Sequence, residues 1–332
     1  MLHTILSFFT FIATSILWAD ASLDLETLSQ DFVVEAKQLQ IPGHPNACNP
    51  SLVRWHNQLL LSFDVYIERS DEPDGVGLAY LDEGFNVIGE PQILDLPRNL
   101  WQDPRLITMG DQLYLVHNGS IAHGVRRMFV TQVRYEEGKF ILEMPEPLLH
   151  FPGEQPLQWE RNWVPFVNND TLFLTYSLAP HRVLQPIFGT QRCEQVAATT
   201  FSSGWTWGHP KPGTAALLDG DHYLALFHSI KKMATIHSEG KTIQHYFIGA
   251  YTFESHPPFA VTCMSEDPII GKNFYHGPEY EMIKPCRAVF PCGIVVDDAF
   301  VWAVFGRQDH EVWMAKLDKR GLYESMRPVA SN

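Results

Sequence analysis

Residues 49–63 read NPSLVRWHNQLLLSF, a stretch with the form of a β-hairpin. A small polar residue opens it, a short apolar strand and a turn follow, and a second strand ends on an aromatic residue. The same form recurs as DPRLITMGDQLYLVH at 103–117, NWVPFVNNDTLFLTY at 162–176, GTAALLDGDHYLALF at 213–227 and PCGIVVDDAFVWAVF at 291–305. We therefore interpret the chain as five copies of one unit.

The spacing of these units predicts the architecture. Their closing residues lie 54, 59, 51 and 78 residues apart. A repeat of about 50 residues with a hairpin and further strands is typical of a β-propeller, because sheets packed radially share a core that one small sheet cannot form. We predict an all-β fold over residues 45–330, a five-bladed β-propeller with a central funnel. A β-sandwich is the alternative, although it would not need a fivefold repeat.

The opening residue of each unit is where we look for chemistry. In a propeller the innermost strands start at the rim of the central channel, so the five opening residues would converge on one funnel. The other explanation of each opening Asn or Asp is local, since these residues favour turns in which their side chains bond the backbone.

Composition favours a folded protein and disfavours one class of partner. The 332 residues are 45% hydrophobic and 19% charged, too apolar for a disordered chain. Lys and Arg number 24 against 38 Asp and Glu, which gives a net charge of −14. This sign opposes binding to a phosphate backbone, so we expect no nucleic-acid partner. Any anion would be held by a small local group of cations. The oligomeric state stays open.

The N-terminus resembles a secretory signal. Residues 5–18 read ILSFFTFIATSILW, an uncharged run followed by small residues and short for a membrane span. We predict a signal peptide over 1–21, an N-terminal extension over 22–44, and a secreted or periplasmic protein with no stable membrane anchor after cleavage. No Lys or Arg precedes Lys37, however, and a buried strand or helix of the domain is the alternative.

The five cysteines do not predict a metal site. Their number is odd, and none shows the paired spacing of a zinc ligand set. Cys286 and Cys292 could pair in an oxidising compartment, and buried free thiols are the alternative. We predict no bound metal from them.

Four stretches on this repeat together resemble a known family. They are, in chain order, Gln102-Asp103-Pro104-Arg105, Glu160-Arg161-Asn162-Trp163, Leu226-Phe227-His228 and Phe305-Gly306-Arg307-Gln308-Asp309. As an ordered set they resemble the five-bladed propellers of glycoside hydrolase family 130, the β-mannoside phosphorylases with their hydrolase and transferase relatives. The resemblance spans about residues 45–325. It implies a carbohydrate-active enzyme that cleaves or forms β-mannosidic or related β-glycosidic bonds in an oligosaccharide or glycoside substrate.

The resemblance implies roles for the matching residues. Asp103 would be the general acid, delivering its proton to the glycosidic oxygen through a sugar hydroxyl. We add residues that lie near the matching motifs in the chain. The predicted substrate-binding residues are then Asn49, Asp64, Arg105, Asn162, Trp163 and Asp309. The predicted phosphate-binding residues are Arg161, His228 and Arg126. Two positions depart from the family, because Gln102 replaces a glutamate and Arg161 replaces a lysine.

Cleavage of a glycosidic bond requires residues of these types. Cleavage with inversion needs an acid for the leaving oxygen and a nucleophile on the opposite face of the sugar. In a hydrolase the nucleophile is water, activated by a second carboxylate roughly 6.5–9.5 Å from the acid. Glu160 is the first candidate for this base and Asp64 the second, unless each pairs with a nearby Arg. In a phosphorylase the nucleophile is inorganic phosphate, which the fork of Arg161 could bind through two hydrogen bonds. We expect no other cofactor.

Other interpretations stay open. Gln102 and the altered anion site also suit a secreted glycan-binding propeller without catalysis. A scaffold that uses the propeller rim for protein contacts has no support beyond the fold. Trp163 could stack on a sugar ring or belong to the core of a blade, and Arg126 could take part in surface charge pairing.

Overall fold

The computed structural model of the protein describes residues 23–67, 73–94, 102–149, 157–278, 280 and 285–331, and the signal peptide predicted over 1–21 lies outside them. The described residues are mostly strand, with one α-helix, α1 (Lys319–Ser325), and the 3-10 helices η2 (Leu25–Leu28) and η3 (Ile236–Ser238). The all-β prediction is confirmed. In this part of the chain, no helix has both the length and the apolar character needed to cross a membrane.

Four sheets follow a path of four antiparallel strands, as a propeller blade does. Their members, in order, are β2 (Cys48–Trp55), β3 (Gln58–Val65), β4 (Gly75–Leu81) and β5 (Val87–Ile93); β6 (Gln102–Met109), β7 (Gln112–Ala122), β8 (Val125–Glu136) and β10 (Glu146–Leu148); β11 (Val164–Asn168), β12 (Thr171–Ser177), β13 (His181–Ile187) and β14 (Arg192–Thr199); and β22 (Val289–Val296), β23 (Phe300–Arg307), β24 (Glu311–Asp318) and β1 (Val33–Gln38). The short β9 (Lys139–Leu142) pairs with the edge of β8.

The remaining large sheet is irregular, and we call it the enlarged sheet. It has seven strands, and they are β16 (Lys211–Pro212), β17 (Leu217–Asp219), β18 (His222–Met233), β19 (Ile243–Glu254), β20 (Val261–Ser265), β21 (Cys286–Arg287) and β25 (Met326–Pro328). A separate two-stranded sheet pairs β15 (Phe201–Ser202) with β26 (Ala330–Ser331).

The prediction of five equivalent blades is therefore wrong, since four regular blades and one enlarged sheet are present among the described residues. The longest interval between repeats, 78 residues, contains the short strand β21 of this sheet, whereas β25 comes from near the end of the chain. Its innermost strand is also broken into β16 and β17. Between them, the Thr214 hydroxyl accepts a hydrogen bond from the Leu226 N–H at 3.0 Å, where a backbone carbonyl would continue the ladder.

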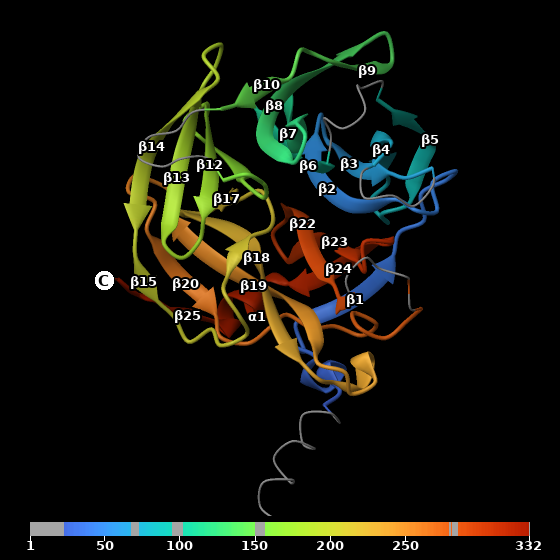
Figure 1. Ribbon diagram of the computed structural model, residues 1–332, viewed down its shortest axis with the longest axis vertical. Helices are drawn as coiled ribbons and strands as arrows, with labels where there is room; N and C mark the ends of the chain where they lie inside the picture. Colours follow the sequence, from blue (N-terminus) through green and yellow to red (C-terminus); the bar gives the residue numbers. More distant parts are fainter. Residues whose placement is uncertain are drawn as a thin grey trace, which may run out of the picture.

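The sheets contact one another in a closed ring (Figure 1). Contacts join β2 to β6, β6 to β11, β12 to β16, β18 to β22, and β22 back to β2. Strand β1, in the segment predicted as an N-terminal extension, pairs with β24, and Ala36 lies opposite Ala315. Strands from both ends of the chain thus complete one sheet, which covers an edge that would otherwise be exposed.

Closing aromatic residues of the hairpins fill the core between strands. Phe63, Phe227 and Phe305 are buried. Phe63 lies opposite Gly77 and Phe227 opposite Gly249 in the strand registers. A Cβ atom at Gly77 would lie 2.3 Å from Cζ of Phe63, so the ring occupies the space that a larger residue at this position would need.

This contact predicts a difference between two glycines of one strand. Gly77→Ala should lower the free energy of unfolding by about 1–3 kcal/mol, because the buried Phe63 ring must move. Gly75→Ala is the matched control: its Cβ would meet its nearest atom at 3.6 Å, an ordinary contact. The control should change stability by less than about 1 kcal/mol. Urea unfolding of both variants measures this, and equal losses would contradict the packing.

Candidate active site

Three opening residues share an uncommon backbone conformation. Asn49, Asp103 and Asn162 have φ values of 48°, 57° and 61°, in the left-handed region that Asn and Asp tolerate better than most residues. At the first two, the strand register shifts between Cys48 and Ser51 and between Gln102 and Arg105. The Asn49-Pro50 and Asp103-Pro104 pairs therefore form matching bulges, which take their side chains out of the regular alternation of the strand.

Asp64, at the end of β3, connects two of these opening residues. Its Oδ2 accepts a hydrogen bond from Asn49 Nδ2 at 2.9 Å and another from the backbone N–H of Asp103 at 3.2 Å. The side chain is fully buried, and its Oδ1 has no hydrogen-bond partner among the described residues. Asp64 thereby fixes the start of β6 against the first sheet.

Burial raises the pKa of the Asp64 carboxyl well above its usual range. The negative charge of Asp103 raises it further. Hydrogen bonds from Asn49 and from the Asp103 N–H, together with the charge of Arg105, oppose the rise without cancelling it. A buried carboxyl with a raised pKa thus lies directly beside the predicted general acid.

The Asp103 side chain is positioned from its own sheet. Its Oδ2 accepts a hydrogen bond from Asn118 Nδ2 at 2.9 Å. Nη1 of Arg126 in turn donates to Asn118 Oδ1 at 3.1 Å and to Gln102 Oε1 at 2.6 Å. The Arg126 guanidinium lies 5.8 Å from the centroid of the Trp159 ring. Arg126, predicted to bind phosphate, is thus engaged in orienting the amide that holds Asp103.

Arg105, predicted to contact substrate, is 2% exposed and spans three sheets. Its Nε donates to the carbonyl of Gly213 at 3.1 Å, and its guanidinium lies 5.8 Å from the centroid of the Phe290 ring. Nη2 is buried and has no hydrogen-bond partner among the described residues. The side chain is therefore placed to join the second sheet to the enlarged sheet and to β22.

The third sheet presents one exposed cation and one buried ring. Arg161 is exposed and Asn162 half-buried. Trp163 is 1% exposed, and its Nε1 donates to Glu160 Oε2 at 3.3 Å. Glu160, the candidate base, is itself buried, and its Oε1 accepts from the Leu157 N–H at 2.6 Å. Trp163 thus lies in the core, and Glu160 holds it there.

His228 on β18 is buried against Phe290, with ring centroids 4.3 Å apart. Burial lowers the pKa of His228 to about 3, and the cations Lys211, Arg105 and Arg161 contribute. Its Nδ1 lies 3.0 Å from the carbonyl of Pro212, which can only accept, so the proton sits on Nδ1. The neutral ring then presents Nε2 as an acceptor, which suits a hydroxyl better than an unprotonated phosphate oxygen.

Two tyrosines show which predicted residues the fold brings together. Burial raises the pKa of Tyr246 to about 12, with further contributions from Cys286, Asp309 and Asp103, while Arg161 opposes the rise. Burial also raises the pKa of Tyr66, and the charges of Asp64, Asp103 and Asp309 add to the effect. Charges act mainly within about 8–10 Å in physiological salt. Asp103 from β6 and Asp309, an exposed residue that follows β23, therefore have both phenols as common neighbours.

The sequence did not identify Asn118, Tyr66 or Tyr246 as residues of the site. A signal for Asn118 was present, because Asp64, Asn118 and His228 each directly follow the closing residue of their hairpin. Comparison of this one position across the units singles out all three. Tyr66 and Tyr246 carry no such mark, since they approach the site from outside the repeated stretches.

The cysteines form no part of this arrangement. All five are free thiols, and Cys286 and Cys292 are both buried. The alternative in which these two cysteines form a disulfide is therefore not realised.

Several solved structures are similar to this protein in fold. The chain is similar to a mannose phosphorylase from Leishmania mexicana in complex with phosphate (13% identity, 92% of this chain and 94% of that chain, TM-score 0.58). It is similar to a β-1,2-mannobiose phosphorylase from Listeria innocua (10% identity, 90% and 95% covered, TM-score 0.58). A third structure represents the family 130 mannoside phosphorylases, which include hydrolases that target β-1,2-mannosidic linkages in Candida mannan (12% identity, 91% and 94% covered, TM-score 0.58).

These similarities extend along nearly the whole length of both chains. Because the sequence identities are this low, the similarities show a shared fold alone. No protein-family model matches the chain, and no curated protein matches it. The chain thus shares its propeller-like fold with mannoside phosphorylases and glycoside hydrolases of family 130.

The raised pKa of Asp64 predicts how stability depends on pH. Between its ordinary value of 3.8 and the higher folded value, the folded protein binds one proton more than the unfolded chain. The free energy of unfolding should therefore fall as the pH rises above about 4, by up to about 1.4 kcal/mol per pH unit. Asp64→Asn removes this titration, so its stability relative to the wild type should rise with pH.

Urea unfolding between about pH 4 and pH 7 measures this. Asp170→Asn, at the exposed turn between β11 and β12, is the control and should follow the wild-type curve. If the Asp64→Asn and wild-type curves ran parallel, the buried carboxyl would not retain its proton.

Proposed function

We propose that the protein is a carbohydrate-active enzyme that cleaves or forms β-mannosidic or related β-glycosidic bonds with inversion, and that Asp103 is its general acid. The observation that carries the proposal is the setting of Asp103. Its backbone N–H bonds to the buried Asp64 and its carboxylate accepts from Asn118, while Tyr66 and Tyr246 have both Asp103 and Asp309 as neighbours. The shared fold with mannoside phosphorylases supports the same class of substrate.

We further propose that the enlarged sheet acts as the fifth blade, so that the opening residues face one central funnel. The closed ring of contacts between the five larger sheets supports this. Asn49, Asp103 and Asn162 would then meet the sugar from three blades, and Asp309 from a fourth. We also propose that residues 1–21 direct secretion and are removed, as their composition indicates.

In the proposed mechanism Asp103 gives its proton to the leaving oxygen, directly or through a sugar hydroxyl, while the nucleophile attacks from the opposite face. Asp64 keeps a proton and so places no second full charge beside the acid. Asn118 and Arg126 hold the carboxylate in one orientation, which lowers the entropic cost of reaching the reactive geometry.

The nucleophile is inorganic phosphate or water. Arg161 is an exposed cation close to both His228 and Tyr246, with the exposed Lys211 also near His228, and it fits a phosphate oxygen pair better than the buried Arg105 does. Glu160 is buried and bonded to the Leu157 N–H and to Trp163, which disfavours it as the base of a hydrolase. We therefore propose phosphorolysis as the first activity to test.

Asp103→Asn tests the general acid. Removing the proton donor should lower kcat on β-1,2-mannobiose by about 10²–10⁴-fold with either acceptor. Chromatography of mannose and mannose 1-phosphate, with and without phosphate, measures turnover and separates phosphorolysis from hydrolysis. Asp111→Asn, in the exposed turn of the same hairpin, should keep wild-type turnover. Unchanged turnover in a folded Asp103→Asn protein would refute the assignment. A glycan-binding protein without catalysis would bind the disaccharide and yield no product.

Arg161 and Arg126 should differ in what they control. Arg161→Met should raise KM for phosphate about tenfold or more and leave KM for the sugar unchanged, because a single exposed cation is lost. Arg126→Met should instead lower kcat without changing KM for phosphate, because Asn118 loses its donor. Initial rates over a matrix of sugar and phosphate concentrations distinguish the two effects. The assignment fails if both variants raise KM for phosphate alike.

A further inference from the structure

A second polar cluster lies at a cavity lined by none of the residues assigned to the active site. The cavity has a volume of about 160 Å³, and its lining includes His237, Tyr275, His276, Arg287 and Gln308. Gln308 Oε1 is buried there and has no hydrogen-bond partner among the described residues. A buried acceptor without a donor among the described residues marks a place where a further polar group could bind.

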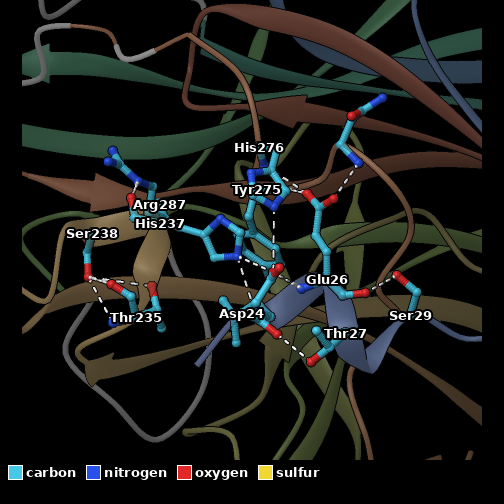
Figure 2. Close-up of polar contacts among 12 residues, drawn as sticks. Asp24, Glu26, Thr27, Ser29, Thr235, His237, Ser238, Tyr275, His276 and Arg287 are labelled. Atoms are coloured by element: carbon cyan, nitrogen blue, oxygen red, sulfur yellow. Dashed lines mark hydrogen bonds and ion pairs between the residues drawn. The ribbon is translucent and has the colours of Figure 1, made fainter. Parts of the chain in front are cut away.

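Asp24 meets His237 and His276, two residues that line this cavity (Figure 2). Asp24 Oδ1 lies 3.0 Å from Nε2 of His237 and 3.6 Å from Nε2 of His276. All three atoms lie within 4.8 Å of one another. Ligands of a tetrahedral zinc ion, at bond lengths of about 2.0–2.1 Å, lie roughly 3.3 Å apart. The three atoms therefore have the spacing of a metal ligand set.

We propose that Asp24, His237 and His276 bind one Zn²⁺ ion, with the fourth coordination position open toward the cavity. Two imidazoles and one carboxylate are a ligand set that zinc accepts. A water in the fourth position would have Gln308 Oε1 within the same cavity as an acceptor for its hydrogen. The spacing of the three ligands along the chain carries no metal motif, which is why the sequence did not predict the site.

Hydrogen bonds in the structure favour a cation between Asp24 and His237. The Leu25 N–H donates to Nε2 of His237 at 3.1 Å, so this nitrogen has no proton to offer Asp24, and a metal ion would take over its one lone pair from the Leu25 N–H. Asp24 Oδ1 nevertheless lies 3.0 Å from the same nitrogen. Two acceptors at that distance repel each other unless a proton or a metal ion lies between them.

The three ligands are also held in place by their surroundings. Glu26 accepts hydrogen bonds from the backbone N–H groups of Tyr275 and His276, both at 2.8 Å. Arg307 donates to the carbonyl of His276, and Arg287 donates to the carbonyl of His237. Asp24 itself caps η2 by accepting from the Glu26 N–H at 2.9 Å. Such outer contacts orient metal ligands before the ion binds.

The proposed ion would connect parts of the fold that are distant in sequence. Asp24 precedes β1, which completes the last sheet, whereas His237 belongs to η3 between β18 and β19. His276 lies in the loop before β21. Zinc would thus fasten the N-terminal segment to the enlarged sheet and stabilise the closure of the ring. It takes no part in the proposed cleavage reaction.

The experiment uses the full chain without an affinity tag, dialysed against a chelator and titrated with Zn²⁺ in a calorimeter. The wild type should bind one equivalent, and zinc should raise its Tm. His276→Ala should weaken binding at least tenfold and lose the Tm shift. His276 is half-exposed, so this variant should fold. Asp24→Asn should behave in the same way.

His222→Ala is the matched control, because His222 forms an exposed pair with Asp221 at 2.5 Å, and among the described residues no third His, Cys, Asp or Glu joins this pair at the spacing of a metal ligand set. It should bind zinc as the wild type does. Replacing Zn²⁺ with Co²⁺ should give an absorption spectrum of nitrogen and oxygen ligands that His276→Ala loses. Absence of zinc binding by the wild type, or undiminished binding by both His276→Ala and Asp24→Asn, would overturn the proposal. Neither result bears on glycoside turnover.

Discussion

The candidate active site depends on one buried carboxyl group, that of Asp64, at the contact between two sheets. Transfer of a carboxyl from water into a core is costly unless hydrogen bonds replace those to water. Asn49 and the Asp103 N–H supply them, and they do so from left-handed backbone that Asn and Asp tolerate. The same contacts therefore stabilise the junction of the sheets and set the position of the proposed acid.

The sequence predicted the repeated part of the fold because its cause is local. Apolar runs on either side of a polar turn specify a hairpin wherever they occur, and the units at 49–63 and 103–117 form β2–β3 and β6–β7. The enlarged sheet could not be predicted in this way. Strand β25 pairs with β20 across more than sixty residues of chain, and β1 pairs with β24 from the opposite end. Such long-range pairings leave no periodic pattern in the sequence.

The site was predicted less completely than the fold. Residue type at the opening of each hairpin pointed to Asn49, Asp103 and Asn162, which all adopt the left-handed conformation. The sequence could not tell which side chains would be buried, and the structure buries both Arg105 and Trp163. Their predicted contact with substrate stays a prediction. Burial depends on the neighbouring sheet, and the pattern of residues within one strand does not reveal that neighbour.

The central claim is that Asp103 and Asp309, from different sheets, face one sugar. A crystal structure with β-1,2-mannobiose bound tests this most directly. The account predicts a sugar ring whose hydroxyl groups contact both carboxylates, near Tyr66 and Tyr246. A disaccharide bound elsewhere, or two carboxylates that open onto separate surfaces, would contradict it.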